Sequence, residues 1–586
     1  MSPAPLRSAS GSIASATDVT SVIAGALALL VLTAAAPVSA ASDTGTGAAV
    51  AGPGPNGVVA QSNDGTENRT LVAEQPRILE LFPNPTAAGN RGEYLVVRLP
   101  ERGNWSLADG YHEASIPTNA SGVVALSMDP ENATALIDDE TAVAGTGGVG
   151  DPELRALDGY FPLAASGDRI ELRRNGTAVA AVDYDRAPEG HRWRADWGEW
   201  RPRGYDSRSA TRTENATVRP FVLPDSPGVP VEPLRAADDR LLLAGYTLGS
   251  ERVADLLVDA ADRGVEVRVL VEGSPVGGFS ARSARLLNRI AAAGVEVRVL
   301  DGDPERFRFH HAKYAVADDR AVVLTENWKA SGTGGRTNRG WGVVTGAARS
   351  STGNGETTAD DLAALFRADA SAPDARAWSS FRADTEFHEG GAANESYPTR
   401  FEPPGATTAD VELLTAPGNA AGRLVARIDA ADDRVLAVVP RTGGPDNRIV
   451  RALRRAADRG VDVHLLVSGA WYDREANRAL VEELADEPIE VSVAEPRGRY
   501  GKVHAKGLVV DDAAVVGSLN WNEGAATENR EVLLAVEDEA VAEFYARAYA
   551  ADWRGGGVHL PVGLLGGLGV ALAGAGAVAR REVAFT

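Results

Sequence analysis

Two stretches of the chain, residues 230–345 and 405–555, alternate between short apolar runs of strand length and longer segments with helical character. The helical segments end in Asp-Arg-Gly, a signal for a helix C-terminus. Strands that alternate with helices in this way predict an α/β fold with a mixed, largely parallel sheet and helices on both faces. The expected strands include Val265–Val271 and Val461–Val467, and the expected helices include 250–263 and 447–459.

The same two stretches repeat each other. Ala236-Ala-Asp-Asp-Arg240 recurs as Ala430-Ala-Asp-Asp-Arg434, which is 194 residues later. This spacing is far longer than the unit of a solenoid, so it indicates a duplicated domain. Residues 346–404, which separate the copies, predict an excursion with one helix near Ala359–Asp369.

Short runs with strand alternation also occupy residues 74–190, and turns such as Asn175-Gly176 separate them. This pattern predicts a small β-sandwich. Residues 191–229 are expected to be a linker to the duplicated part. Residues 41–73 are rich in Gly, Ala, Ser, Thr and Asn, which predicts a disordered linker.

Both ends of the chain carry apolar segments. Val22–Leu32 followed by small residues predicts a signal peptide over 1–40; an uncleaved anchor is the alternative. Residues 558–579 lack formal charge and are long enough for one transmembrane helix, although a flexible Gly/Ala tail is the alternative. Arg580 and Arg581 follow at once, so the C-terminus is expected in the cytoplasm and the rest outside the cell.

Composition narrows the chemistry. The chain has no cysteine, which excludes disulfides, Cys-ligated zinc and thiol catalysis. Its formal net charge is −22, which disfavours nucleic-acid binding through the overall field but leaves room for a local basic groove. Only four of its 59 basic residues are lysines. An acidic chain poor in lysine is typical of a halophile, and a GC-rich genome would also favour arginine.

Each copy ends in the same array of polar residues. The His and Lys of each array are two residues apart, so they point to the same face of a strand, and an Asn follows 16 residues after each His. Each copy therefore offers one imidazole, one ammonium and one carboxamide. The arrays contain His311, Lys313, Asp318 and Asn327 in the first copy and His504, Lys506, Asp511 and Asn520 in the second.

Two such arrays facing each other suit phosphoryl transfer by a covalent route. One imidazole attacks phosphorus, and the other protonates the leaving oxygen and later deprotonates water. The ammonium and carboxamide groups hold the non-bridging oxygens, so no metal or other cofactor is expected. The remaining lysines, Lys329 and Lys502, also lie beside the arrays, so all four lysines of the chain gather there.

The arrays resemble the H-x-K-x4-D-x6-G-S-x-N signature of the phospholipase D superfamily. The resemblance implies a duplicated phospholipase D-like α/β/α sandwich in which one chain supplies both half-sites, so no oligomer is required. It implies His311 as nucleophile and His504 as general acid, phosphoryl binding by the lysines and asparagines, and support of each motif by its aspartate, Asp318 or Asp511.

The sequence departs from that signature in three ways. The first copy has Leu324-Thr325 in place of Gly-Ser, and both copies have five residues where the signature has six. The resemblance implies a downstream carboxylate that orients an imidazole, and Glu531 suits this role. The matching position in the first copy is Gly340, which leaves the assignment of nucleophile and acid open.

The N-terminal segment resembles the lamin-tail domain, on the strength of Ile78–Pro85, Gly92–Leu99, Trp105–Gly110 and Ser166–Leu172. This resemblance implies an Ig-like binding or targeting module of the kind found on exported enzymes. Its ligand is left open.

Three functions remain at this point. The first is an exported, membrane-anchored phosphodiesterase acting on phospholipid headgroups, by hydrolysis or by transfer to an alcohol. The second is an extracellular nuclease with the same chemistry, and the third is a non-enzymatic surface-binding protein. The membrane anchor and the acidic charge favour the lipid.

Overall fold

A computed structural model describes residues 75–87, 89–137, 152–206, 208–303, 305–347, 357–391 and 393–553. The predicted signal peptide, the linker of 41–73 and the predicted transmembrane segment of 558–579 lie outside these residues. Among the helices within the described ranges, none is long and apolar enough to cross a membrane.

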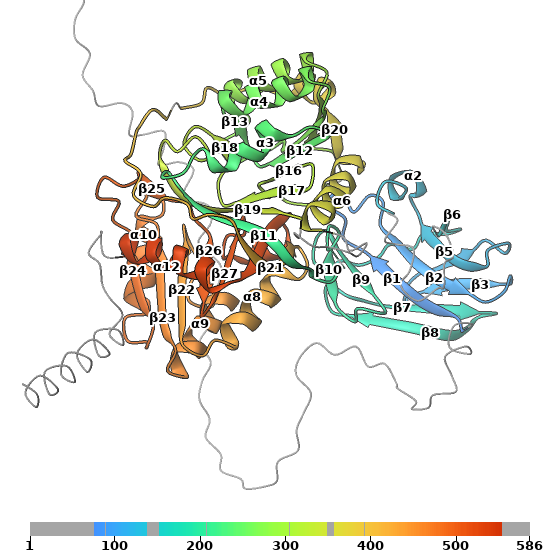
Figure 1. Cartoon of the computed structure of the whole chain (residues 1–586). Helices are drawn as coiled ribbons and strands as arrows, with labels where there is room; N and C mark the ends of the chain where they lie inside the picture. Colours follow the sequence, from blue (N-terminus) through green and yellow to red (C-terminus); the bar gives the residue numbers. More distant parts are fainter. Residues whose placement is uncertain are drawn as a thin grey trace, which may run out of the picture. The chain divides into compact units, whose positions relative to one another are not determined.

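The N-terminal part forms two β-sheets that share one hydrophobic core (Figure 1). The sheets have the strand orders β10-β9-β1-β2-β5-β6 and β4-β3-β7-β8, and both contribute side chains such as Leu81 and Leu172 to the core. The two-sheet arrangement agrees with the predicted β-sandwich, and its membership of the lamin-tail family stays a prediction. The strands are β1 (Arg77–Phe82), β2 (Tyr94–Leu99), β3 (Trp105–Ala108), β4 (Glu113–Ile116), β5 (Gly122–Ser127), β6 (Glu153–Ala156), β7 (Asp168–Arg174), β8 (Thr177–Tyr184), β9 (His191–Arg194) and β10 (Trp200–Pro202).

Residues 191–229 are not the plain linker that the sequence suggested. Strands β9 and β10 complete the first sheet of the sandwich, and β11 (Thr211–Leu223) lies in the middle of the large sheet that follows. These strands lack a continuous apolar run because β9 mixes arginine with aromatic residues and only the end of β11 is apolar. Pairing with neighbours, and not local pattern, makes them strands.

The duplicated part builds one sheet of sixteen strands (Figure 1). Its order is β20-β15-β14-β12-β16-β17-β19-β11-β21-β28-β27-β26-β22-β23-β24, with β25 paired to β19, so the copies form the two flanks of the central pair β11–β21. The first flank contains β12 (Arg240–Gly245), β14 (Glu266–Glu272), β15 (Glu296–Leu300), β16 (Tyr314–Ala317), β17 (Arg320–Leu324), β19 (Asn338–Gly346) and β20 (Ala375–Ala377). The second contains β21 (Thr407–Ala416), β22 (Arg434–Val439), β23 (Asp462–Val467), β24 (Glu490–Val493), β25 (Lys502–Val503), β26 (Gly507–Val510), β27 (Ala513–Gly517) and β28 (Glu531–Glu537).

The expectation of a largely parallel sheet is wrong in part. Within the large sheet, parallel pairing inside each copy involves β12–β14–β15 and β22–β23–β24 in the described residues, and most other neighbours are antiparallel. The reason is that each motif aspartate sits in a tight turn, so β16–β17 and β26–β27 are hairpins. A parallel connection would have needed a crossover of a dozen or more residues.

Helices cover both faces of the sheet, as predicted. The core beside α4 and α5 is separate from the core beside α8 and α9, whereas α6 and α12 share one central core with strands of both copies. The ring of Trp341 on β19 stacks on Tyr545 of α12, with ring centroids 4.5 Å apart. The helices are α3 (Glu232–Ala236), α4 (Glu251–Asp262), α5 (Ala281–Ala292), α6 (Thr358–Ser371), α7 (Trp378–Asp384), α8 (Ala420–Asp429), α9 (Arg448–Asp458), α10 (Arg474–Glu483), α11 (Glu523–Thr527) and α12 (Glu539–Trp553).

Candidate active site

The backbone of each motif histidine is held by the other copy. His311, just before β16, donates its backbone N–H to the carbonyl of Arg530 at 2.9 Å, and His504, between β25 and β26, donates to the carbonyl of Arg339 at 3.0 Å. Strand β25 also pairs with β19 across the copies. The two motifs therefore meet where the copies join, as a shared site requires.

The imidazoles are oriented by carboxylates in a crossed arrangement. The Nδ1 atom of His311 lies 2.9 and 3.0 Å from the two oxygens of Glu531, which belongs to the second copy. The Nδ1 atom of His504 lies 3.2 Å from an oxygen of Glu326, which belongs to the first copy. A proton on each Nδ1 leaves each Nε2 with a free lone pair or an exchangeable proton, as nucleophilic and acid–base roles require.

The sequence did not reveal Glu326 as a site residue. Glu326 supplies the carboxylate that the sequence pattern lacks in the first copy, where Gly340 stands at the position that matches Glu531. Glu326 lies in the variable position before Asn327, where the second copy has Leu519. A Cβ atom on Gly340 would lie only 2.3 Å from Cγ of Glu326 and 2.7 Å from its Oε1. The side chain of Glu326 therefore fills the space beside Gly340 and supplies the carboxylate from the neighbouring strand connection. The only signals for it in the sequence were an acidic residue inside the motif and a glycine downstream.

Burial shapes the protonation of the site. Desolvation by burial lowers the pKa of both His311 and His504 to about 4, against the opposing pull of Glu531 and Glu326. Both imidazoles are thus neutral near pH 7 in the free protein. Burial raises the pKa of Glu326 and Glu531, but the hydrogen bonds from the imidazoles and the charges of the motif lysines hold it below the usual range, so both carboxylates are ionised.

The two motif lysines converge on the same site. Lys313 donates to the carbonyl of His311, and Lys506 donates to the carbonyl of His504 at 2.8 Å. Each lysine also lowers the pKa of the histidine of the opposite copy, so each ammonium lies within electrostatic range of both rings. Burial lowers the pKa of Lys506 to about 8 and that of Lys313 well below its usual range. Closely spaced ammonium groups with a destabilised charge favour an anion between them.

The other predicted residues complete the surroundings. Oδ1 of Asn327 is buried and has no hydrogen-bond partner within the described residues, and Asn520 is half-buried. Tyr246, at the end of β12, was not predicted. Its ring lies 4.8 Å from the ring of His311 and 5.1 Å from Nζ of Lys313, so it forms an apolar wall on the first-copy side.

Asp318 and Asp511 make structural contacts only. Asp318 accepts hydrogen bonds from the backbone N–H groups of Asp238, Asp239 and Arg240 at 2.9–3.0 Å. Asp511 accepts the equivalent three bonds from residues 432–434, also at 2.9–3.0 Å. The repeated Ala-Ala-Asp-Asp-Arg segment is therefore the backbone cradle of the motif aspartate, which ties the hairpin turn to the start of the first strand.

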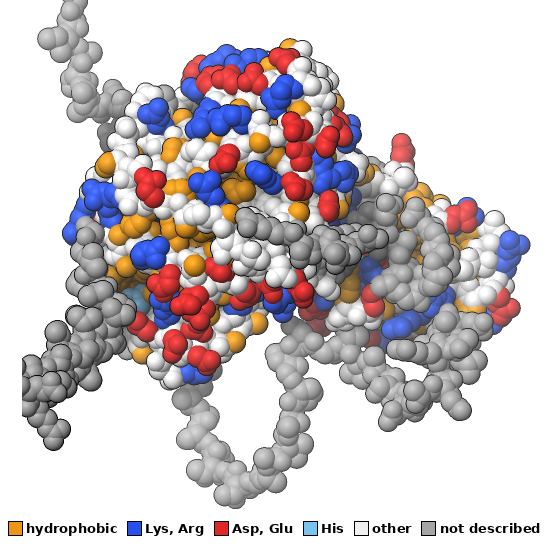
Figure 2. All heavy atoms as spheres, in the orientation of Figure 1, with side chains coloured by type: hydrophobic (Ala, Val, Ile, Leu, Met, Phe, Trp, Pro, Cys, Tyr) orange, Lys and Arg blue, Asp and Glu red, His pale blue; other side chains and the backbone are white. Residues whose placement is uncertain are grey.

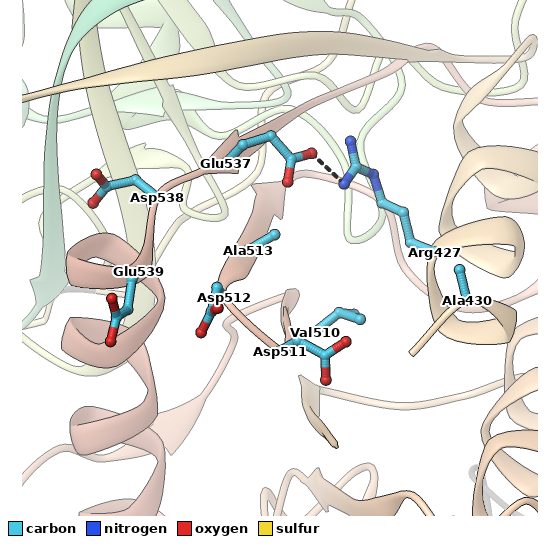
Figure 3. A pocket seen from close by; sticks show the side chains of 9 residues that line it. All are labelled: Arg427, Ala430, Val510, Asp511, Asp512, Ala513, Glu537, Asp538 and Glu539. Atoms are coloured by element: carbon cyan, nitrogen blue, oxygen red, sulfur yellow. Dashed lines mark hydrogen bonds and ion pairs between the residues drawn. The ribbon is translucent and has the colours of Figure 1, made fainter. Parts of the chain in front are cut away.

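A surface cavity of about 420 Å³ lies at the Asp511 turn, at the opposite end of β26 from Lys506 (Figure 3). Its charged side chains include one arginine, Arg427, which pairs with Glu537. The other lining residues are Ala430, Val510, Asp511, Asp512, Ala513, Asp538 and Glu539. This cavity is predominantly acidic and is not part of the histidine site. Within the described ranges, no group of three or more histidine and carboxylate side chains is arranged to hold a metal ion.

The fold and the crossed histidines define a class of protein: a duplicated α/β domain with one two-histidine site. Residues 231–353 and 424–553 match the family model described as "Cardiolipin synthase, PLD-like domain". The duplicated part of the chain, over these two matched segments, belongs to the phospholipase D superfamily.

Individual relatives match a shorter segment of the chain or match it at low sequence identity. Cardiolipin synthase A of Pseudomonas aeruginosa is 37% identical over 119 residues, which cover 20% of this chain and 24% of that protein. The chain thus spans about a quarter of the length of this relative. Among solved structures, phosphatidylserine synthase of Haemophilus influenzae is 14% identical with a TM-score of 0.39 and covers 57% of this chain and 86% of its own. Nuc of Salmonella typhimurium is 24% identical with a TM-score of 0.22, and the match covers 24% of this chain and 93% of Nuc.

Proposed function

We propose that the chain is an exported, membrane-anchored phosphodiesterase that acts on phospholipid headgroups through a covalent phosphohistidine. The crossed pairing of two imidazoles with two carboxylates, beside two buried ammonium groups, is the observation that carries the proposal. This set of groups supplies a nucleophile, an acid and a charge sink for one phosphoryl group.

His311 is the better candidate for the nucleophile. Both oxygens of Glu531 approach its Nδ1, whereas His504 has a longer contact to Glu326 and also lies 3.4 Å from Nζ of Lys506. The firmer carboxylate contact fixes the proton on Nδ1 and directs the Nε2 lone pair of His311 toward phosphorus.

The reaction then proceeds in two displacements. Binding of the anionic phosphodiester beside the ionised Glu326 raises the pKa of His504, so Nε2 of His504 takes up a proton from solvent before the reaction. Nε2 of His311 then attacks phosphorus and the bond to the headgroup oxygen breaks, with that oxygen taking the Nε2 proton of His504. Water then gives a proton to His504 while its oxygen attacks phosphorus, and the bond to His311 breaks. An alcohol in place of water would give transfer of the phosphatidyl group. The name of the matched relative, a cardiolipin synthase, supports this variant.

A lipid is favoured over a nucleic acid for two reasons. The predicted transmembrane segment of 558–579 would hold the site close to a bilayer and raise the effective concentration of lipid. A long polyanion would also meet the field of a chain with a net charge of −22.

The test is an assay of the full chain in detergent on phosphatidylglycerol and on single-stranded DNA, in high salt. We expect His311→Ala and His504→Ala each to lower turnover by roughly 10⁴-fold. The control is His464→Gln, because His464 lies on β23 and contacts Asp462 and Glu490 instead of the site. His504→Ala should accumulate an acid-labile phosphoryl group on His311 with an activated substrate. Turnover of DNA alone would establish the nuclease, and wild-type rates in both alanine variants would refute the mechanism.

A further inference from the structure

Two lysines outside the predicted catalytic set lie beside the site without any carboxylate to neutralise them. Within the described part of the chain, no lysine forms an ion pair with a carboxylate, whereas most ion pairs involve arginine. Nζ of Lys502 lies over the ring of Tyr472 and donates to its hydroxyl at 2.7 Å, and Nζ of Lys329 has no hydrogen-bond partner within the described residues. A half-buried ammonium without a counter-charge is unfavourable in the free protein.

The backbone places both lysines next to the histidine site. Lys502, His504 and Lys506 follow one another at intervals of two residues, so they project from the same face of the extended chain. Lys329 is two residues after Asn327, on the short strand β18 (Trp328–Lys329), and the stem of its side chain runs over Gly249. Burial lowers the pKa of Lys329, and the charge of Lys502 adds to this shift, so the two ammonium groups are within electrostatic range of each other across the copies.

The equivalent positions on the opposite side of the site are different. The spacing of 193 residues between the motifs pairs Lys502 with Phe309 and Lys329 with Asn522. Phe309 contacts the ring of Tyr246, and Asn522 caps helix α11. The nearby cation on that side, Arg308, is neutralised by Glu528 at 3.3 Å. One side of the site is therefore aromatic and has its cation paired with a carboxylate, and the other carries two lysines that form no ion pair with a carboxylate.

We propose that Lys329 and Lys502 form a second anion subsite, which holds a phosphate on the headgroup that leaves during the reaction. The inference rests on the proposed function, because the subsite lies on the side of His504, the proton donor to the leaving headgroup. It names the substrate class as a phospholipid whose headgroup carries a second phosphate.

Two surroundings of the pair support a small dianionic headgroup. Burial raises the pKa of Asp473, and the charges of Arg441, Lys502 and Lys506 oppose this rise. Asp473 forms no ion pair with either lysine within the described residues, so it offsets part of the local positive charge without occupying the subsite. Trp471 and Tyr472 are exposed by 83% and 48% on the loop that carries Asp473, next to Lys502. Exposed aromatic rings beside a cationic site are suited to the interface of a bilayer.

The test compares two lipids that differ only in a terminal phosphate, phosphatidylglycerol and phosphatidylglycerol phosphate, with the full chain in mixed micelles. We expect wild-type kcat/KM to be about tenfold higher for the phosphorylated headgroup, since two charge-assisted contacts are added. Lys329→Gln with Lys502→Gln should bring the ratio of the two kcat/KM values to about one. Lys329→Arg with Lys502→Arg should keep part of the ratio, because the charge remains. The matched control on the aromatic side, Arg308→Gln, should keep it in full.

The outcomes separate the subsite from the proposed function. Equal use of both lipids by the wild type, with normal dependence on His311, overturns the subsite and leaves the chemistry standing. Absence of turnover on either lipid contradicts the proposed function, and calorimetry then tests the subsite. Pyrophosphate should bind about tenfold more tightly than phosphate, and the double glutamine variant should lose this difference. A lysine-dependent preference for a 5′-phosphorylated dinucleotide, without lipid turnover, would overturn the choice of lipid.

Discussion

At the scale of single residues, Glu326 and Gly340 are coupled positions. The second copy holds its orienting carboxylate at Glu531 and has the apolar Leu519 inside the motif, whereas the first copy reverses this arrangement. The absence of a side chain at Gly340 leaves the room that the carboxylate of Glu326 occupies. A carboxylate can thus reach the motif histidine from either of two adjacent backbone positions. The other position must then hold a residue without a carboxylate, such as Gly340 or Leu519.

This coupling predicts a rescue. Glu326→Leu should lower kcat by roughly 100-fold, because His504 loses the group that fixes its tautomer. Gly340→Glu alone should also lower kcat, since its side chain would overlap Glu326. The double variant gives the first copy the same two residue types as the second copy. We expect its kcat to be at least about tenfold higher than that of Glu326→Leu alone. Kinetics on one lipid substrate, with melting temperatures as a check of folding, would measure this. A double variant no faster than Glu326→Leu would show that the two positions are independent.

How far the site could be predicted follows from these residues. The sequence revealed the motif histidines and lysines because each His-x-Lys pair is short and occurs at equivalent positions in both copies. These residues are His311, Lys313, His504 and Lys506. Glu326 was missed because the comparison of copies follows the order of residues along the chain, whereas the side chain reaches across to Gly340 on the adjacent strand. Spacing along a strand fixes which face a residue occupies, but not which neighbouring strand fills a gap.

His310 gives a second prediction at this scale. Its ring is fully buried, neither nitrogen has a hydrogen-bond partner within the described residues, and burial lowers its pKa to about 4. Because the unfolded chain takes up this proton near pH 6.5, stability is present above that pH and is lost as the pH falls toward 4. His310 alone should remove about 2 kcal/mol of unfolding free energy between pH 7 and pH 5.

The measurement is denaturant unfolding followed by tryptophan fluorescence at both pH values. His310→Gln should reduce the difference between the two pH values by about 2 kcal/mol, whatever its effect at pH 7. His311 and His504 shift in the same direction and add to this pH dependence, whereas Glu93 and Glu272, whose pKa burial raises to about 7, oppose it equally in the wild type and the variant. An unchanged difference in the variant would mean that His310 is protonated in the folded state, paired with Asp369 at 3.9 Å.

At the scale of elements, the motif aspartates explain why the two hairpins are so short. Asp318 and Asp511 have positive φ values of 54° and 48°, a conformation that Asp and Asn tolerate better than most residues. Each also accepts three backbone hydrogen bonds from the cradle at the start of the first strand. The turn and the cradle therefore set the register between β12 and β16, and hence the position of His311 and Lys313.

We expect Asp318→Ala to destabilise the protein by about 3 kcal/mol, since it removes three charge-assisted bonds and places alanine at positive φ. Asp318→Asn keeps one acceptor oxygen and a side chain that tolerates this φ, so its cost should be about 1 kcal/mol. Denaturation midpoints would measure both. Activity per folded molecule should fall less than stability, in contrast to the variants of His311. Equal costs for the two substitutions would contradict the account.

Elements were predicted best where one segment buries its own apolar face. The helices α4, α6 and α9 and the strands β14 and β23 were all expected from their patterns. Strand β11 was missed because its first half is polar and only its place between β19 and β21 makes it a strand. The antiparallel hairpins were missed because their turns consist of Asp-Asp, which does not announce a two-residue turn as Asn-Gly does.

At the scale of the whole molecule, the copies are fused by buried charges as well as by the sheet. Arg339 on β19 pairs with Asp225 at 2.6 Å and with Asp552 of α12 at 2.7 Å. Arg499 of the second copy also pairs with Asp552, at 2.9 Å. All four side chains are almost completely buried, so removing one would leave an uncompensated charge. Helix α12 is therefore held, up to its last residue Trp553, against the two repeated copies, which together form the catalytic body.

That fixed end makes the proposed tether separable from the catalytic body. On the face drawn in Figure 2, acidic and basic side chains are interspersed over α4 and α5, as on an ordinary solvated surface. The proposed contact with the bilayer then depends on residues 558–579 and on the exposed Trp471 and Tyr472.

A chain that ends at residue 553 should keep α12 and its ion pairs, and with them the wild-type kcat on a soluble diester such as bis(4-nitrophenyl) phosphate. On phosphatidylglycerol vesicles it should lose at least about tenfold in rate, because the tether no longer concentrates the site at the surface. Fractionation should move the truncated chain from the membrane to the supernatant.

Protease added to intact cells should cut the full chain between the sandwich and α12 if the catalytic body faces outward. Protection of the full chain from protease, with the truncated chain still sedimenting with membranes, would contradict both the anchor and its orientation.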